Sequence, residues 1–280
     1  MGLVASGLIV DHFGFAAMAL VMAALALGFR YLGMIGVWSR AKESRDIAEM
    51  PFRDAMRATF SNTYFLLFLP TFVLFQIGLQ MVLGVLPFYV KAVLEAENEG
   101  TWVAVLTGTA IAATAVVGAP LFARLALRTS KRQAYRTAML AATLAFPLLF
   151  FAGFVPGIPE VAQILVVVAV IGAPIAGVYL FPSALTADIA DYDAVRTGMR
   201  REGAYFGTQN FVEKTTTSVT PLLLAGLLLI GKTTDDPLGI RLVGPVAGLF
   251  VLGGYLLFRG YDLPDEVIPP TAAEAAAETA

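Results

Sequence analysis

Residues 161–185 read VAQILVVVAVIGAPIAGVYLFPSAL, a largely apolar stretch without a charged side chain. A helix needs about 20 mostly apolar residues to cross a hydrocarbon core of about 30 Å, so this stretch is long enough to span a bilayer. Six further stretches have the same character, and no stretch shows the short alternating pattern of a membrane β-barrel. The sequence therefore predicts an all-α, polytopic membrane protein with about seven transmembrane helices, at 15–38, 64–90, 101–124, 136–154, 161–185, 204–230 and 242–259.

The composition of the whole chain agrees with this fold class. Of the 280 residues, 58% are hydrophobic and 14% are charged, and the mean hydropathy is +0.76. Soluble domains carry about 25% charged residues. The chain has no cysteine and one histidine, His12, which excludes disulfides and thiolate metal sites and leaves little for zinc or histidine-based catalysis.

The same composition bears on the class of function. A net charge of −2 does not indicate a surface that binds nucleic acid. The sequence contains no recognisable nucleophile–base pair, metal-ligand cluster or glycine-rich phosphate loop. We therefore expect that the protein is not an enzyme, that it has no catalytic or metal-binding residues, and that it binds no nucleic acid.

The distribution of basic residues predicts the orientation in the membrane. The connections at 39–62, 124–136 and 187–203 hold thirteen lysines and arginines, whereas the opposite connections hold three, namely Lys91, Lys232 and Arg241. Cytoplasmic connections carry the excess of positive charge. We therefore expect a multi-pass protein of the plasma membrane, or of the inner membrane in a Gram-negative bacterium, with a cytoplasmic C-terminus.

Polar side chains inside the predicted spans indicate a candidate site. Lys214 lies about ten residues into the sixth span, roughly 15 Å deep at 1.5 Å per residue. Ionisable residues at such a depth usually mark a pathway or a binding site, although a structural ion pair is the alternative for Lys214. Glutamines in spans also join helices to each other, and this alternative stays open. The candidate substrate or coupling residues are Lys214, Gln209, Asn210, Glu213, Gln76, Gln80 and Tyr179.

A more specific signal lies at 187–223, ADIADYDAVRTGMRREGAYFGTQNFVEKTTTSVTPLL. The stretch combines an Asp-x-x-Asp-Tyr pattern at 188–192 with Arg-Thr-Gly at 196–198 and Arg-Arg-Glu-Gly at 200–203. It resembles the glycoside–pentoside–hexuronide:cation symporter family of the major facilitator superfamily. The match is specific in this stretch and looser over the rest of the chain.

The resemblance implies a domain organisation. The family has twelve helices in two six-helix halves, and this chain looks like the sixth through twelfth helices, that is, the C-terminal half plus one preceding helix. Residues 1–38 would be a helix stub and the sixth helix, 39–62 the cytoplasmic connection between halves, 63–260 the C-terminal bundle and 261–280 a disordered cytoplasmic tail. A cytoplasmic gate would be formed by Asp188, Asp191, Arg196, Arg200, Arg201 and Glu202.

The resemblance also implies a function. We expect cation-coupled symport of a sugar or glycoside-like solute by alternating access, with Na⁺ or H⁺ as the coupling ion and no other cofactor. Lys214 and Gln209 match a functional lysine and a glutamine in helix eleven of the family. The connection after the third span departs from the superfamily pattern, because Ala123, Leu127 and Ser130 replace its Gly, Asp and Gly.

Several alternatives stay open at this point. We expect the chain to be truncated at its N-terminus, so that the N-terminal half is missing or is supplied by a partner chain. An inactive fragment, or a half-transporter that needs a partner, is the first alternative. A seven-helix retinal protein or receptor, with Lys214 as the Schiff-base lysine, is the second. The polar row around Lys214 is unlike an aromatic retinal pocket.

Overall fold

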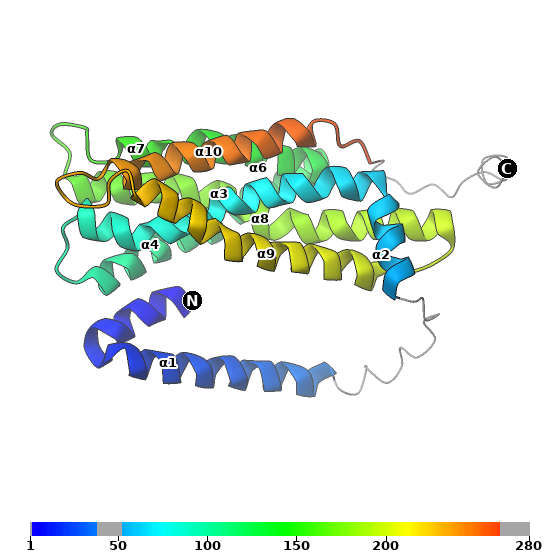
Figure 1. Cartoon of the computed structure of the whole chain (residues 1–280), viewed down its shortest axis with the longest axis horizontal. Coiled ribbons are helices and arrows are strands. Elements are labelled where there is room, and N and C mark those ends of the chain that lie inside the picture. Colours follow the sequence, from blue (N-terminus) through cyan, green and yellow to red (C-terminus); the bar gives the residue numbers. More distant parts are fainter. Residues whose placement is uncertain (1, 38–51, 264–280) are drawn as a thin grey trace.

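The computed structural model describes residues 2–37 and 52–263, and in this part of the chain every regular element is a helix (Figure 1). The prediction of an all-α fold is confirmed. The elements are α1 (Gly2–Val37), α2 (Phe52–Ser61), α3 (Thr63–Ala92), α4 (Glu99–Ala113), the π-helical turn η2 (Thr114–Gly118), α5 (Ala119–Arg128), α6 (Lys131–Ala145), α7 (Leu148–Phe151), α8 (Glu160–Thr197), α9 (Glu202–Leu228) and α10 (Leu238–Phe258).

Six of the described helical stretches are long and apolar enough to cross a membrane. They are Phe13–Ile35, Thr63–Ala92, Glu99–Arg128, Lys131–Phe151, Glu160–Thr197 and Leu238–Phe258. The remaining predicted span, the sixth (204–230), is present as the 27-residue helix α9, but its many threonines, together with Asn210, Glu213 and Lys214, make it too polar to qualify. The multi-pass helical architecture is thus confirmed, with six apolar spans rather than seven.

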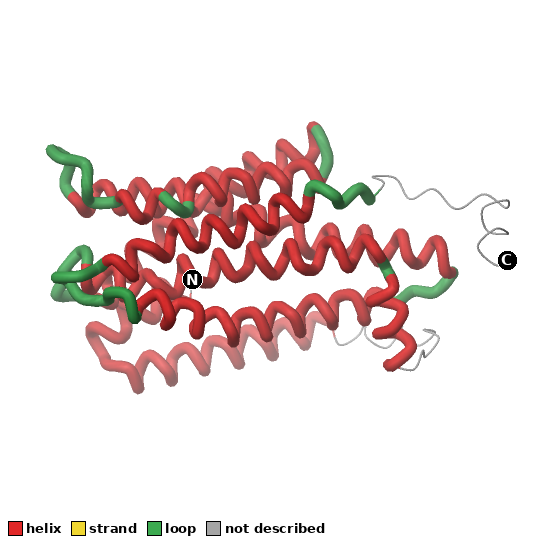
Figure 2. The backbone as a smooth tube through the Cα atoms, turned by 45° about the horizontal axis from the view of Figure 1, so that its top comes forward, coloured by secondary structure: helices red, strands yellow, loops and turns green. Residues whose placement is uncertain are grey.

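The long helices from α3 to α10 form one bundle, and α2 lies across one end of it (Figures 1 and 2). Helix α3 packs against α10 and α9, and α8 packs against α4 and α6. Tyr135 lies fully buried in the core, with its ring 5.1 Å from that of Phe258 and 5.9 Å from that of Phe75. Helix α1 contacts the bundle through α4, and most side chains between Phe13 and Ile35 are exposed.

Small residues allow the close approach of α8 to the α4–η2 helix. A Cβ atom on Gly118 would collide with the carbonyl oxygen of Ala173, and one on Gly172 would collide with that of Ala110. The Thr114 hydroxyl donates a hydrogen bond of 2.6 Å to the Gly172 carbonyl oxygen across the same interface. Small residues with interhelical hydrogen bonds are the usual means by which membrane helices associate.

Two of the predicted spans have different boundaries in the structure. Helix α8 continues to Thr197, where the predicted connection had begun at 187, because the apolar limit of a span is not the limit of its helix. It ends at Gly198, whose φ of 68° is the left-handed conformation that glycine adopts after a helix. The fourth span begins earlier than predicted and is interrupted at Pro147. Tyr261 and Leu263 are buried, and the rest of the predicted tail, 264–280, lies outside the described part.

Candidate functional site

Helix α9 carries polar side chains on two faces. One face is buried against the bundle and includes Tyr205, Thr208, Gln209, Thr216 and Thr220. Several hydroxyls of the helix donate to the carbonyl oxygen four residues earlier, for example Thr216 to Val212 at 2.8 Å and Ser218 to Lys214 at 2.9 Å. These bonds satisfy the hydroxyls within the helix itself, which explains how a run of threonines remains helical in an apolar surrounding.

The other face of α9 is exposed, and its polar side chains are Asn210, Lys214, Thr215, Thr217 and Ser218. Lys214 makes no ion pair within 4.0 Å to any acidic side chain in the described residues. Its neighbour Glu213 is half-buried and interacts electrostatically with Tyr179 of α8, which is 66% exposed. The structure thus places Glu213 near Tyr179, with Asn210 and Lys214 on the exposed face of the same helix as Glu213.

These four side chains supply complementary chemistry. They combine an amide, a carboxylate, an ammonium group and a phenol, which together can donate hydrogen bonds to a hydroxylated solute and accept them from it. The aromatic ring of Tyr179 also offers an apolar surface to a solute ring.

The three candidate glutamines lie elsewhere. Gln209 is buried, and its Oε1 accepts a 2.7 Å hydrogen bond from the Thr186 hydroxyl of α8. Gln76 of α3 is buried too, and its Oε1 has no hydrogen-bond partner among the described residues. Gln80 is half-buried one turn further along α3. Of these three glutamines, Gln209 alone makes a described hydrogen bond to another helix, which is the helix-joining role left open from the sequence.

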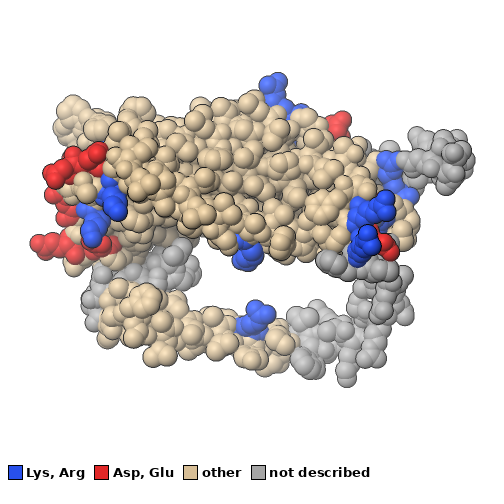
Figure 3. Space-filling view, in the orientation of Figure 1, with Lys and Arg blue, Asp and Glu red and all other residues tan. Residues whose placement is uncertain are grey.

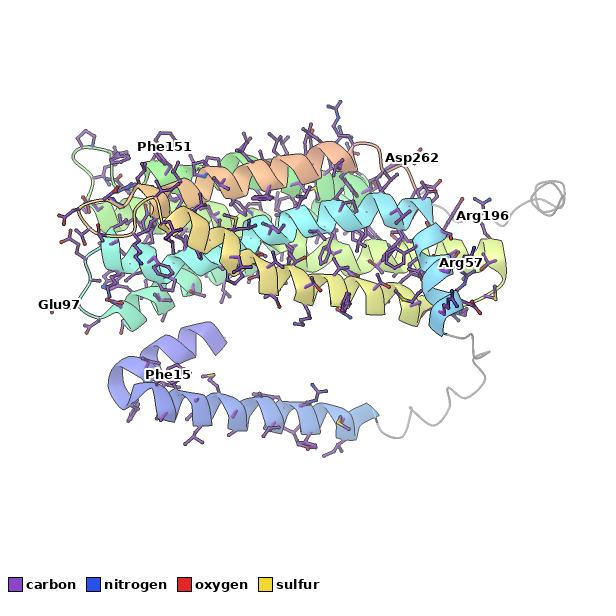
Figure 4. The ribbon with its side chains drawn as sticks, in the orientation of Figure 1. Phe15, Arg57, Glu97, Phe151, Arg196 and Asp262 are labelled. Carbon is purple, nitrogen blue, oxygen red and sulfur yellow. The ribbon has the colours of Figure 1, made fainter. Side chains whose placement is uncertain are left out.

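Charged residues gather at the two ends of the bundle and leave a mostly uncharged surface between them (Figure 3). Arg57 and Arg196 lie at one end, and Glu97 and Phe151 lie at the other (Figure 4). We refer to the end that holds Arg57 and Arg196 as the basic end. It contains all six predicted gate residues, which lie in the last turns of α8, in the connection after it and at the first residue of α9.

Among the gate residues at the surface, Arg200 and Glu202 bind each other, whereas Asp188 and Arg196 bind residues outside the predicted gate. Asp188 binds Lys131 of α6, with Nζ–O distances of 2.7 and 2.9 Å. Arg200 binds Glu202 at 2.7 Å. Arg196 donates to the Tyr192 hydroxyl at 2.9 Å. Asp191 is exposed and makes no ion pair with any described residue. Exposed pairs of this kind contribute only about 0–1 kcal/mol to stability.

One gate residue, Arg201, takes part in a buried network. Its Nε lies 3.5 Å from Oδ2 of Asp193, and the two side chains are 7% and 11% exposed. The fully buried Tyr205 lies close to Asp193, and its hydroxyl accepts a 3.0 Å hydrogen bond from Nδ2 of Asn62. Oδ1 of Asn62 in turn caps α3 by accepting from the backbone N–H groups of Tyr64 and Phe65.

The sequence reasoning missed Asp193 and Asn62. An asparagine directly before the first residue of a helical span is an N-cap signal, and this signal could have identified Asn62. No pattern in the sequence distinguishes Asp193 from its exposed neighbour Asp191.

An open cavity of about 560 Å³ lies beside this network at the basic end. Side chains from α2, from the start of α3 and from the ends of α8 and α9 surround it. They are Asp54, Arg57, Ser61, Asn62, Thr63, Tyr64, Tyr192, Asp193, Arg196, Thr197 and Arg201. In the described part of the chain, no three His, Asp or Glu side chains are grouped so that they could hold a metal ion.

Comparison with known proteins supports a relationship to transporters. A family model described as MFS/sugar transport protein matches residues 2–237. An uncharacterized symporter of Synechocystis sp. (strain ATCC 27184 / PCC 6803 / Kazusa) is 25% identical over 231 residues, which cover 76% of this chain and 41% of that protein. The chain therefore spans less than half the length of this relative.

Proposed function

The chain belongs to the MFS/sugar transport protein family, and from this premise we propose that it takes part in cation-coupled symport of a sugar or glycoside-like solute by alternating access. Its family and its six apolar helices make it a multi-pass membrane protein of the transporter class. The resemblance of residues 187–223 to a symporter family agrees with the family match. Solute class, coupling ion and mechanism form the proposal.

The observation that carries the proposal is the exposed polar face of α9. Asn210, Lys214, Thr217 and Ser218 lie within a helix that runs the length of the bundle, so they lie well inside the membrane-spanning part of the bundle. Exposure of an ammonium group to lipid at that depth costs several kcal/mol. The face is therefore better suited to an aqueous pathway, a solute, or a second helical unit than to acyl chains.

The second helical unit is part of the proposal. Alternating access requires two bundles that rock about a site between them. The polar faces of α8 and α9 would form one wall of this site, and an N-terminal half or a partner chain would form the other. Lys214 would hold solute hydroxyls or a carboxylate of the opposite wall, and Glu213 would take part in coupling to Na⁺ or H⁺.

Uptake measurements test this function. Cells that express the gene with its native flanking sequence are supplied with a labelled pentose, a labelled hexuronate and a labelled glycoside, with and without a Na⁺ or pH gradient. We expect gradient-driven accumulation of at least one of these solutes. The Lys214→Ala variant is expected to lose this accumulation while its amount in the membrane stays the same.

A loop lysine provides the matched control. Lys232 is exposed in the connection before α10, so Lys232→Ala removes the same charge far from the proposed site and should leave uptake unchanged. Normal accumulation by Lys214→Ala would refute the role of Lys214. Failure of every solute under both gradients would refute the proposed symport.

A further inference from the structure

We propose that Asn62, Tyr205, Asp193 and Arg201 form a latch that fixes α2 to the basic end of the bundle. We call these four residues the basic-end latch. Helix α2 is the last part of the predicted connection between the two halves, so the latch would make the end of this connection move together with α8 and α9. The inference concerns the position of α2 and does not depend on the identity of a solute.

The first support is the continuity of the network across separate elements. Asn62 is the single residue between α2 and α3, Asp193 lies near the end of α8, and Arg201 and Tyr205 lie at the start of α9. The side-chain oxygen Oδ1 of Asn62 accepts hydrogen bonds from the N-terminus of α3, and its side-chain nitrogen Nδ2 donates one to the Tyr205 hydroxyl. The amide therefore connects the α2–α3 corner to the two helix ends that surround the buried ion pair.

The second support is the cost of the buried pair. Taken as whole residues, Asp193 and Arg201 are each 9% exposed. Even so, Oδ2 of Asp193 and Nε of Arg201 make no hydrogen bond with any described residue. A buried ion pair with imperfect hydrogen bonding contributes little to stability, because desolvation offsets the attraction. The best-attested role of such groups is to fix one arrangement of elements against others.

The third support is the short length of α2. It is a ten-residue helix that packs against α3 and α9. One of its contacts with α9 is the 3.5 Å approach of the Thr208 hydroxyl to the Met56 sulfur. Isolated helices of this length are marginal in water, so α2 needs contacts with the bundle to keep its structure and orientation. The corner at Asn62, between α2 and α3, supplies such a contact.

The absence of cysteine from the chain makes a direct test possible. Met56→Cys and Thr208→Cys together place two thiols at neighbouring positions of α2 and α9. The rate of disulfide formation under a mild oxidant in membrane vesicles then reports the fraction of time that α2 spends packed on α9. We expect rapid intramolecular disulfide formation in this pair. Each change to the latch should slow it at least fivefold.

Three variants break the latch in different ways. Asn62→Ser keeps an N-cap for α3 but is too short to reach the Tyr205 hydroxyl. Tyr205→Phe removes the hydroxyl and preserves the ring. Asp193→Asn removes the charge that faces Arg201. The control is Asp188→Asn, which breaks the exposed pair with Lys131 on the same helix without touching α2, and it should leave the rate unchanged.

The outcomes separate a latch from a general loss of structure. Each variant is first checked for an unchanged elution profile in detergent. If Asp193→Asn does not fold, Asn62→Ser and Tyr205→Phe decide, because they leave the ion pair intact. A rate that is unchanged in these two variants overturns the proposal, and so does an equal slowing by Asp188→Asn.

Discussion

Gln163 uses both atoms of its side-chain amide to organise the loop between α7 and α8. Its Oε1 accepts from the backbone N–H groups of Gly153 and Val155 at 2.9 and 3.1 Å. Its Nε2 donates to the carbonyl oxygens of Val155 and Ile158 at 2.9 and 2.8 Å. The side chain is buried, so this glutamine replaces the water that the loop backbone would otherwise need.

We predict that Gln163→Ala lowers the free energy of unfolding by about 2 kcal/mol, because four backbone groups lose a buried partner at once. Thermal unfolding of the purified chain in detergent measures the effect. Gln133→Ala, at an exposed position of α6, should change the free energy by less than about 0.5 kcal/mol. Equal melting temperatures for the two variants would contradict the structural role of Gln163.

At the scale of the elements, packing between helices depends on where small residues meet. Gly118 of η2 faces the backbone of α8 closely, whereas Gly226 near the end of α9 has no atom within 4 Å of the place where a Cβ would lie. The same substitution therefore has opposite consequences at the two positions.

We predict that Gly118→Ala destabilises the chain by about 1–3 kcal/mol, because the new methyl group forces η2 and α8 apart. Gly226→Ala should be neutral or stabilise by up to about 1 kcal/mol through better helix propensity. Loss of helical signal on heating, followed by circular dichroism, distinguishes the two. A stable Gly118→Ala variant would show that the α4–α8 contact is looser than the structure describes.

The helices were predictable from the sequence, whereas several contacts at their ends were not. Hydropathy located each of the six apolar spans in the described part of the chain, because the bilayer requires long apolar segments with internally satisfied backbones. It could not locate the end of α8, since polar residues such as Asp188 and Asp191 continue a helix beyond the membrane. Nor could it show that Gln209 faces Thr186 while Lys214 is exposed, because both lie in polar rows of one helix.

The basic end shows the same limit for the candidate site. Arginines and aspartates at 188–202 were identified as a group, but their pairing depends on which helix faces which. Asp188 pairs with Lys131, which is distant in sequence, and Arg201 pairs with Asp193, which was not among the candidates. The proposed roles of Lys214, Glu213, Asn210 and Tyr179 remain predictions.

At the scale of the whole molecule, the charge distribution predicts which end lies in the cytoplasm. The basic end contains the lysine- and arginine-rich connections at 124–136 and 187–203 and the described part, 52–62, of the first one, and cytoplasmic ends carry such an excess. The opposite end has acidic residues such as Glu95, Glu97 and Asp235 beside its few basic ones. We therefore expect the basic end to face the cytoplasm.

Single cysteines in this cysteine-free chain test the orientation. An impermeant maleimide should label Glu97→Cys and Thr234→Cys on intact cells. It should label Thr129→Cys and Met199→Cys only after the membrane is permeabilised. All four positions are exposed in the structure, so burial does not confound the comparison. The reverse labelling pattern would contradict the predicted orientation.

The central claim is that the exposed polar face of α9 borders water and not lipid. The most direct measurement is the rate at which a water-soluble methanethiosulfonate reagent modifies single cysteines in membrane vesicles. We predict that Asn210→Cys and Ser218→Cys react at least tenfold faster than Leu249→Cys, an exposed apolar position on α10. Equally slow reaction at all three positions would place the α9 face in lipid and contradict the account.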